Sequence, residues 1–370
     1  MYDILRPARL ESAMTDENKV LYGVPLAPSH IPRLAAVSRL LGPQSVGVFI
    51  DHPDQLQSLL NTDTTVWPGR IPIFIKIDTG SHRAGLSAES PGLVSIADNL
   101  ARHNERLDLV GTYAHAGHSY ACNSPQDAMN YLGDELESTV AATEVLLKHL
   151  PATQQPLTIS IGATPTATST QTLLRTMSAA SPMRQYLEKI QSRFHVEIHA
   201  GVYSLLDMQQ MATGARASWV GTERQLHMDS IGLRIMVEVA SVYNDREKPE
   251  ALICAGSVVL GREPCKSYSG WGVVTPWRTP GGSESVPEYQ ARAGGDGEGW
   301  IVGRVSQEHG MLTWEGTQAL QHQLRVGEKL MIWPNHACIA GSNIGWYLVI
   351  DSEKGEKDVV TDVWVRSRGW

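Results

Sequence analysis

The first half of the chain alternates short apolar runs with longer amphipathic stretches. Six short runs are rich in Val, Ile, Leu and other strand-forming side chains, and polar or turn-forming residues bound each of them. Strands that alternate with helical stretches are typical of βα units around a parallel sheet. The runs predict strands at Val20–Leu26, Val46–Asp51, Ile73–Asp78, Leu109–Ala116, Leu157–Ile161 and Val196–Val202.

Between these runs, apolar residues recur every three or four positions, which is the period of an amphipathic α-helix. Leu34, Val37 and Leu41 share one helical face in this way. The same spacing predicts two further helices, at Leu93–Leu100 and Met129–Val140. These stripes predict helices that pack on the sheet, so we expect an α/β fold in this part of the chain.

From about residue 230 onward, the pattern changes to strand after strand with no long helix between them. This change predicts a β/α domain over residues 1–230 and an all-β domain over residues 231–370. A polar, glycine-rich loop is predicted at Pro276–Gly299. The predicted strands of the second domain are Ile235–Val242, Leu252–Leu260, Gly272–Thr275, Trp300–Ser306, Lys329–Trp333 and Trp346–Ile350.

Composition narrows the functional classes. The chain has 370 residues, of which 42% are hydrophobic, and its net charge of -8 argues against a nucleic-acid partner. No apolar stretch reaches the roughly 18 residues that span a bilayer, and the first residues lack the pattern of a signal peptide. We therefore expect a cytoplasmic protein with no membrane partner. The 4 cysteines are too few and too scattered for a disulfide framework.

Polar residues gather where the predicted strands of the first domain end. The segments that begin at Asp78, Tyr113, Ser160 and Glu197 combine glycines with hydroxyl, imidazole and carboxylate side chains. Active sites lie at the carboxyl ends of the strands in a parallel barrel. The stretch Ser160–Thr166 also offers hydroxyls and a glycine, which suit a phosphate group. Ordinary turn chemistry explains any one of these segments, but four in succession predict a site.

In the second domain, His336 and Cys338 are two residues apart in an apolar stretch that we predict to be a strand. Side chains at positions i and i+2 of a strand point to the same face, so both can bind one zinc ion at about 2.0–2.3 Å. Two protein ligands leave coordination positions open, as in a catalytic zinc site. The alternative is a buried cysteine beside a hydrogen-bonded histidine.

Taken together, these segments make the chain resemble the eukaryotic D-serine dehydratase family, which is related to alanine-racemase-like pyridoxal phosphate (PLP) enzymes and to D-threonine aldolases. The resemblance implies a PLP-binding TIM-type (β/α) barrel and a zinc-binding C-terminal β domain. It also implies a small D-amino acid as substrate and a homodimer. It runs from about residue 18 to residue 370 and depends on Phe74–Gly85, Tyr113–Tyr120, Ser160–Thr166, Glu197–Tyr203, Arg304–Gly310 and Pro334–Cys338.

The resemblance implies roles for residues around the cofactor. Thr164, Gly201 and Val202 match positions that contact the cofactor phosphate, while Tyr113 and Tyr120 match tyrosines that line the cofactor. The family often has Asn where this chain has Val202, so only a backbone contact is retained there.

The resemblance also implies residues at the metal and near the cofactor ring. His336 and Cys338 match the zinc ligands, and Arg83 resembles an arginine near the ring. Other side chains can orient ligands or substrate, or can be histidines that only form structural hydrogen bonds. These are His115, His118, Glu308 and His309.

One family segment does not occur in this sequence. The Schiff-base lysine of the family lies on the first barrel strand in a segment of the form RxHxKTHK, which is absent here. Lys76 matches a different family lysine, so the catalytic residue stays unassigned. Because Val20–Leu26 resembles the family's third strand, we expect a barrel that lacks its first two βα units, as in a truncated gene model. Without the lysine, we expect little or no turnover.

The reaction implied by the resemblance is β-elimination from D-serine, which gives pyruvate and ammonia. PLP would supply an electron sink, and zinc would act as a Lewis acid on the β-hydroxyl group. Two alternatives remain open: a D-threonine aldolase-like enzyme that releases glycine, and an inactive barrel that acts as a binding protein.

Overall fold

The computed structural model describes residues 20–67, 69–151, 156–176, 178, 181–216, 226, 228–275, 286, 289–290, 297–351 and 359–366. These residues form two compact units. The β/α unit contains the described residues up to 201, with 215 and 216, and the β unit contains residues 202–214 and those from 226 onward. Most of the loop predicted between residues 276 and 299 lies outside the described residues.

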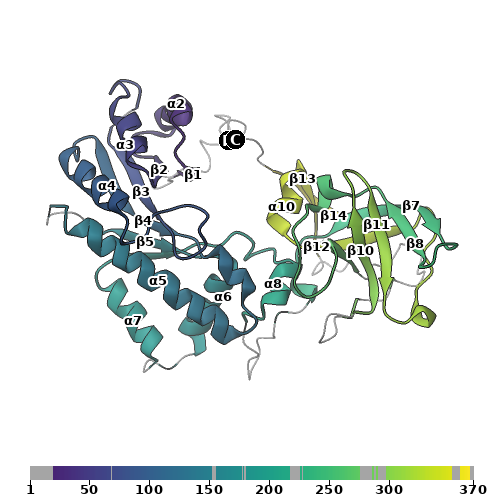
Figure 1. Ribbon diagram of the computed structural model, residues 1–370. Coiled ribbons are helices and arrows are strands. Elements are labelled where there is room, and N and C mark those ends of the chain that lie inside the picture. The colour runs from purple at the N-terminus through teal and green to yellow at the C-terminus, as the bar shows by residue number, and fades with distance from the viewer. Residues whose placement is uncertain are drawn as a thin grey trace. The chain divides into compact units, whose positions relative to one another are not determined.

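The β/α unit is built on one parallel sheet whose strands follow each other in chain order (Figure 1). All six predicted strands are confirmed, with ends shifted by a few residues. They are β1 (Val20–Pro25), β2 (Val46–Ile50), β3 (Ile71–Ile77), β4 (Leu107–Ala114), β5 (Thr158–Ile161) and β6 (His195–Ile198).

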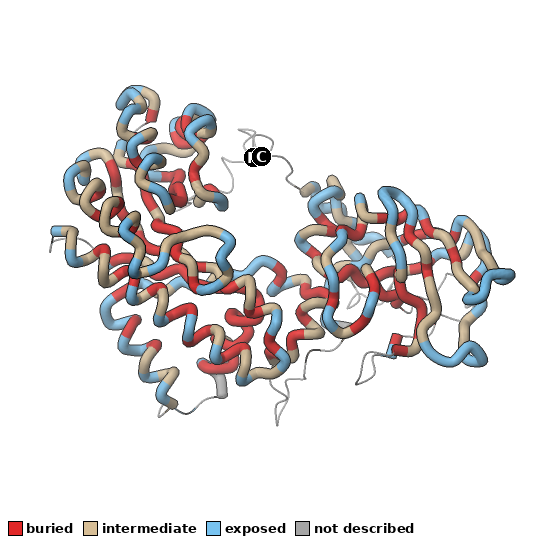
Figure 2. The backbone as a smooth tube through the Cα atoms, viewed as in Figure 1, coloured by how far each residue is buried: buried red, intermediate tan, exposed pale blue. Residues whose placement is uncertain are grey.

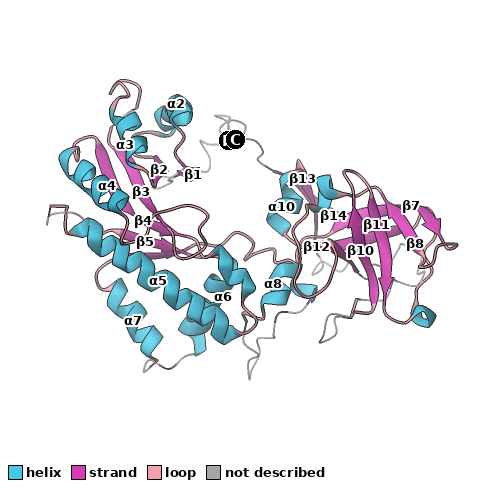
Figure 3. Cartoon of the chain, in the orientation of Figure 1, coloured by secondary structure: helices cyan, strands magenta, loops and turns pink. Residues whose placement is uncertain are grey.

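Helices lie between successive strands of this sheet, as the alternating pattern predicts (Figure 3). The three helices predicted from apolar spacing are confirmed as α2, α4 and α5. The helices of the unit are α2 (Ile31–Leu41), α3 (Pro53–Leu60), α4 (Pro91–Arg102), α5 (Pro125–Leu147), α6 (Thr164–Thr176) and α7 (Pro182–Gln191).

Burial explains the sequences of these strands. Every residue of β2 is buried, and so are all but one in β3, because central strands of a parallel sheet are covered on both faces. Figure 2 shows buried segments running along the strands and the inner sides of the helices. At one edge of the sheet, β6 is largely exposed.

Ser90 and Ser124 cap α4 and α5 by accepting hydrogen bonds from backbone N–H groups, which fixes where these helices begin.

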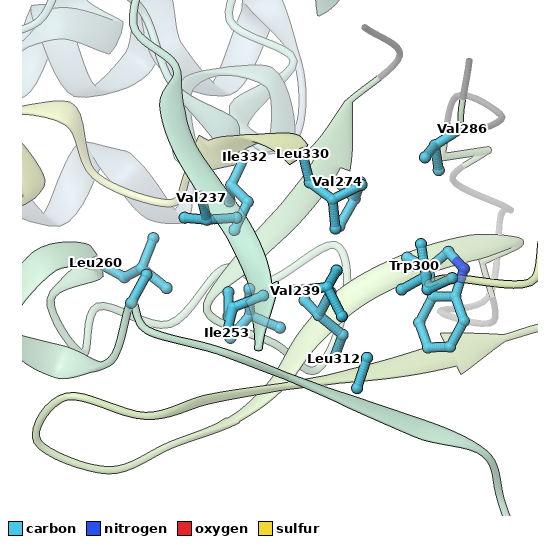
Figure 4. Packing of buried hydrophobic residues seen from close by; sticks show 14 residues of the cluster. Val237, Val239, Ile253, Leu260, Val274, Val286, Trp300, Leu312, Leu330 and Ile332 are labelled. Carbon is cyan, nitrogen blue, oxygen red and sulfur yellow. The ribbon is translucent and has the colours of Figure 1, made fainter. Parts of the chain in front are cut away.

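The β unit contains a closed barrel of antiparallel strands, so the predicted all-β architecture is confirmed. Their neighbour order is β10-β11-β8-β7-β12-β9. Val239, Ile253, Trp300 and Leu312 contribute to a buried apolar cluster in its interior (Figure 4). The strands are β7 (Ile235–Tyr243), β8 (Glu250–Ile253), β9 (Gly272–Thr275), β10 (Gly299–Val305), β11 (Gly310–Glu315) and β12 (Lys329–Pro334).

The prediction of one strand over Leu252–Leu260 is wrong. Strand β8 ends at Ile253, and the chain turns at Gly256 into the short helix α9 (Ser257–Leu260). A Cβ atom at Gly256 would lie 2.4 Å from the carbonyl oxygen of Ser306, so only glycine fits this turn. Strand β11 was not predicted.

A separate two-stranded ribbon in the β unit pairs β13 (Trp346–Ile350) with β14 (Val360–Val365), of which only β13 was predicted. Trp346 lies opposite Val365, and Leu348 lies opposite Val363, so these side chains share one face. Between 50% and 66% of each of these four residues is exposed. The ribbon therefore presents an apolar surface.

Candidate active site

A row of polar side chains crosses the parallel sheet near the carboxyl ends of β3 to β6. Lys76 pairs with Tyr113, Tyr113 with Ser160, and Ser160 with Glu197. Residues in register on adjacent strands point to the same face. The Lys76 Nζ atom lies 4.8 Å from the centroid of the Tyr113 ring, and the Ser160 hydroxyl donates to Glu197 Oε1 at 2.6 Å. Four polar strand ends thus meet in one continuous row.

Aromatic rings stack beside this row. The rings of Tyr113 and His199 have centroids 4.1 Å apart and planes only 10° apart, and Phe49 contacts Tyr113 at 4.5 Å. Burial, assisted by the Glu197 carboxylate, raises the pKa of Tyr113 to about 12, so the phenol stays protonated. A flat ligand ring finds suitable stacking partners here.

Lys76 is the one lysine that is buried among the residues described. Burial lowers its pKa to about 8, with a further lowering by the nearby Arg83 guanidinium. An amine with this pKa is partly uncharged near neutral pH, so Lys76 can exchange a proton there.

Two neutral imidazoles, those of His115 and His199, lie beside the row. Burial lowers the pKa of His115 to about 4 and that of His199 to about 3. The His115 Nδ1–H group donates to the Gly162 carbonyl oxygen at 2.8 Å. Because Ser160 donates its own proton to Glu197, His199 Nδ1 donates to the Ser160 oxygen at 3.0 Å. This leaves His199 Nε2 as a buried acceptor with no hydrogen-bond partner, which suits an N–H donor on a ligand.

The loop after β5 has a backbone that only glycine can adopt. Gly162 has φ +147, and a Cβ atom there would lie 1.9 Å from the His199 carbonyl oxygen. Two residues later, Thr164 begins α6 and is 1% exposed. The first turn of an α-helix points N–H groups outward and carries a partial positive charge, so it binds anions such as phosphate. The residues present therefore fit a phosphate-bearing cofactor.

Glu135 of α5 was not predicted as a site residue, although it holds this loop. It is 1% exposed, and its carboxylate accepts hydrogen bonds from Ala116 N and Gly162 N, both at 2.9 Å, and from the Thr166 hydroxyl at 3.1 Å. Burial raises the pKa of Glu135. A signal was present in the sequence, because Glu135 follows Leu132 by three positions within the apolar stripe.

The other predicted cofactor residues lie on three further segments of the chain. Tyr120 is half-buried in the short helix η2 (Gly117–Ala121), and Arg83 is exposed in the loop after β3. Gly201, which is exposed, and Val202, which is 1% exposed, follow β6. The contacts of these four residues with a cofactor remain predictions.

The local structure predicted for the metal pair is wrong. Strand β12 ends at Pro334, and His336 is instead the N-cap residue of α10 (Ala337–Ser342), which contains Cys338. The two side chains therefore do not alternate along a strand. The buried Asn335 ends the extended segment, because its amide bonds to the carbonyl oxygens of Glu263 and Gly270 and accepts from Tyr268.

Neighbouring side chains orient this pair. The His336 Nδ1–H group donates to Gln209 Oε1 at 2.6 Å, so a metal-binding role would fall to Nε2 of the same ring. Asp207 lies fully buried before α8 (Met208–Thr213) and accepts from the N–H of Ala337 at 2.9 Å, between His336 and Cys338. Partial burial of the thiol raises the pKa of Cys338, and the charge of Asp207 raises it further. The residue as a whole is exposed.

Within the described part of the chain, no group of three or more His, Cys, Asp or Glu residues could hold a metal ion. Imidazole and thiolate are nevertheless preferred zinc donors, and two of them suit a site that keeps open positions.

The helices described include none that is long and apolar enough to cross a membrane.

Two family models match separate parts of the chain. Residues 21–179 match the family described as alanine racemase, N-terminal domain, and residues 232–350 match the putative serine dehydratase domain. The D-serine dehydratase of Schizosaccharomyces pombe is 32% identical over 370 residues, which cover 99% of this chain and 76% of that protein. The D-serine dehydratase of Saccharomyces cerevisiae is 32% identical over 359 residues, covering 95% and 75%.

A solved structure shows the same fold. D-threo-3-hydroxyaspartate dehydratase from Delftia sp. HT23 superposes with a TM-score of 0.70 at 25% sequence identity. The match covers 98% of this chain and 82% of that one. The parallel sheet and the β barrel thus belong to one known architecture.

Proposed function

This chain belongs to the D-serine dehydratase family, and from that membership we propose that it is a PLP- and zinc-dependent D-serine ammonia-lyase. D-serine would lose its α-proton and its β-hydroxyl group, and the resulting aminoacrylate would hydrolyse to pyruvate and ammonia. We assign cofactor binding to residues 1–230 and metal binding to residues 231–370.

The observation that carries the proposal is the row Lys76, Tyr113, Ser160 and Glu197 beside the glycine loop of β5. It combines a stacking surface with the start of α6, where the phosphate of PLP would bind near Thr164. The unpartnered Nε2 atom of His199 would accept a hydrogen bond from the ring nitrogen of the cofactor. When bound, PLP supplies an electron sink for negative charge at the substrate Cα atom.

The chain's own groups would hold and move the protons. Lys76, whose pKa is lowered to about 8, is suited to take a proton from a substrate carbon and return it to water. His115 and His199 stay neutral because their pKa values are lowered to about 4 and about 3, so they orient the cofactor without competing charge.

His336 Nε2 and the Cys338 thiolate would hold zinc, and zinc there would supply Lewis acidity for a hydroxyl leaving group. The chemistry of this donor pair and its orientation by Gln209 support the assignment.

We further propose a homodimer in the cytoplasm. The apolar face of the β13–β14 ribbon supports an assembly because exposed apolar patches mark interaction sites.

The test separates binding from turnover. The purified protein is equilibrated with PLP and zinc, bound PLP is measured by fluorescence, and bound zinc is measured by mass spectrometry. We expect about one of each per chain. If a lysine of this chain holds the cofactor, pyruvate and ammonia should form from D-serine but not from L-serine. Glycine from D-threonine would favour an aldolase instead, and failure to bind PLP would refute the proposal.

A second measurement addresses the unassigned lysine. Borohydride treatment of the PLP complex, followed by peptide mapping, identifies any lysine that carries the cofactor. Because Lys76 is the one buried lysine described, a label there would assign this role to it. PLP binding without a labelled lysine, together with no turnover, would support a binding protein.

A further inference from the structure

We propose that Glu135 is a positioning residue of the cofactor site. Its buried carboxylate fixes the backbone of the loops that follow β4 and β5, and so holds the start of α6 in the geometry that receives the cofactor phosphate. This inference rests on the proposed function, because it concerns the same site.

The first argument is the position of the charge. Glu135 is 1% exposed in the middle of α5, where its buried neighbours include Leu132, Leu136 and Thr139. A carboxylate in such surroundings is costly unless hydrogen bonds compensate it. Three donors do so: the N–H groups of Ala116 and Gly162 in the two loops, and the Thr166 hydroxyl in the first turn of α6.

The second argument is which backbone groups it holds. Ala116 follows His115, and Gly162 begins the loop that leads to Thr164. Gly162 is held at both of its polar atoms, because its N–H donates to Glu135 and its carbonyl oxygen accepts from His115. One carboxylate therefore fixes the spacing between the imidazole of His115 and the loop after β5.

The third argument is the link into α6. The Thr166 hydroxyl donates to Glu135 Oε2 and accepts from the N–H of Ala163 at 2.9 Å. The residues before and after Thr164 are thus tied to the same carboxylate. A loss of this link would shift the N–H groups at the start of α6, which are the groups that bind an anion.

The test compares two probes, PLP and pyridoxal, which lacks the phosphate. Glu135→Leu removes all three hydrogen bonds at similar size. We expect its PLP affinity to fall about tenfold or more while its pyridoxal affinity changes less than about twofold. Dissociation constants from fluorescence titration provide both values. A general loss of structure would weaken both probes together and would overturn the inference.

Glu135→Gln is the conservative rescue. The amide oxygen can accept from Ala116 and Gly162, and the amide nitrogen can donate to the Thr166 oxygen, which then donates to the Ala163 carbonyl oxygen. We expect PLP affinity within about threefold of the unaltered protein. An equal loss in both variants would overturn the positioning role.

Two further variants complete the design. Thr139→Val is the matched control, because Thr139 is fully buried one turn along α5 and its hydroxyl donates only to the Glu135 carbonyl oxygen. It should leave the ratio of PLP to pyridoxal affinity unchanged. If Glu135→Leu does not fold, Thr166→Val removes the hydroxyl that joins Glu135 to Ala163, keeps the bonds to Ala116 and Gly162, and should weaken PLP binding about threefold to fivefold.

The two possible failures are distinguishable. If the unaltered protein does not bind PLP, the proposed function fails and this inference fails with it. If the unaltered protein binds PLP, and Glu135→Leu or Thr166→Val binds it equally well, only the inference fails.

Discussion

Two buried carboxylates organise the two units of this protein, and their surroundings differ. Glu135 in the β/α unit and Asp207 in the β unit each accept hydrogen bonds from two backbone N–H groups. Around Glu135 the candidate site residues lie on adjacent strands, where Lys76 and Ser160 are buried. Next to Asp207 it lies on a helix cap, where Cys338 is exposed.

This difference shows two ways to prepare a site. In the β/α unit, strand register and ring stacking place the side chains before any ligand binds. In the β unit, the chain orients one imidazole and one thiol and leaves the remaining positions of a metal to water or substrate. We therefore expect substitutions of Glu135 and of the groups that it holds to affect PLP first, and substitutions near Asp207 to affect zinc first.

The largest expected effect is at Gly162. Gly162→Ala places a methyl group where the His199 carbonyl oxygen lies, so the strand ends must separate. We expect a loss of about 3–5 kcal/mol of unfolding free energy, together with loss of PLP binding. Urea unfolding and PLP titration measure both. Gly23→Ala is the control, because a Cβ atom there meets nothing within 4 Å; equal losses in both variants would contradict this explanation.

The second effect is a pH dependence of folding stability that arises in the β/α unit. The pKa values of His115 and His199 are lowered in the folded state to about 4 and about 3, so below about pH 6.5 the unfolded chain binds more protons. Stability should fall as the pH decreases from 7 to 5, by about 3–4 kcal/mol for the two groups together. His115→Asn and His199→Asn should each flatten this slope in unfolding titrations, and an unchanged slope would refute the assignment.

The third effect belongs to the β unit. Asp207→Ala frees the N–H groups of Ala337 and Gln210, so the segment between the two proposed zinc ligands loses its anchor. We expect zinc affinity to fall about 10–100-fold, with PLP affinity unchanged within about twofold. Competition with a chelator measures the first and fluorescence the second. A larger loss of PLP affinity than of zinc affinity would contradict a role of Asp207 at the zinc site.

The smallest effect is at Gln209. Gln209→Leu removes the acceptor for His336 Nδ1–H but keeps a similar volume. Because this bond selects the nitrogen that faces the metal, zinc affinity should fall about tenfold while the melting temperature changes little. Gln57→Leu is a suitable control, since Gln57 is exposed on α3 in the other unit. An equal loss of zinc affinity in Gln57→Leu would refute the role of the hydrogen bond between Gln209 and His336.

The sequence predicted the parallel strands well because each is a local run of strand-forming residues that polar or turn-forming residues bound. It failed where geometry depends on contacts distant in sequence. The extended stretch before Cys338 ends because Asn335 bonds to the carbonyl oxygens of Glu263 and Gly270. The polar strand ends were predicted as a group, but their register was not, since register depends on pairing between strands. Asp207 was missed because it is recognisable only from its partners, and Glu135 was missed although its position within the apolar stripe was a signal, because that position does not show which groups it binds.

The register of the row Lys76, Tyr113, Ser160 and Glu197 sets how this site can change in evolution. Loops between the strands can gain or lose residues without moving the row, because pairing is set within the sheet. A single residue inserted into β4 before Tyr113 would turn that side chain to the opposite face and bring its neighbour into the site. Length variation among homologues should therefore be confined to the helix side of each βα unit, and the strand segments should tolerate exchange of residues but not insertion.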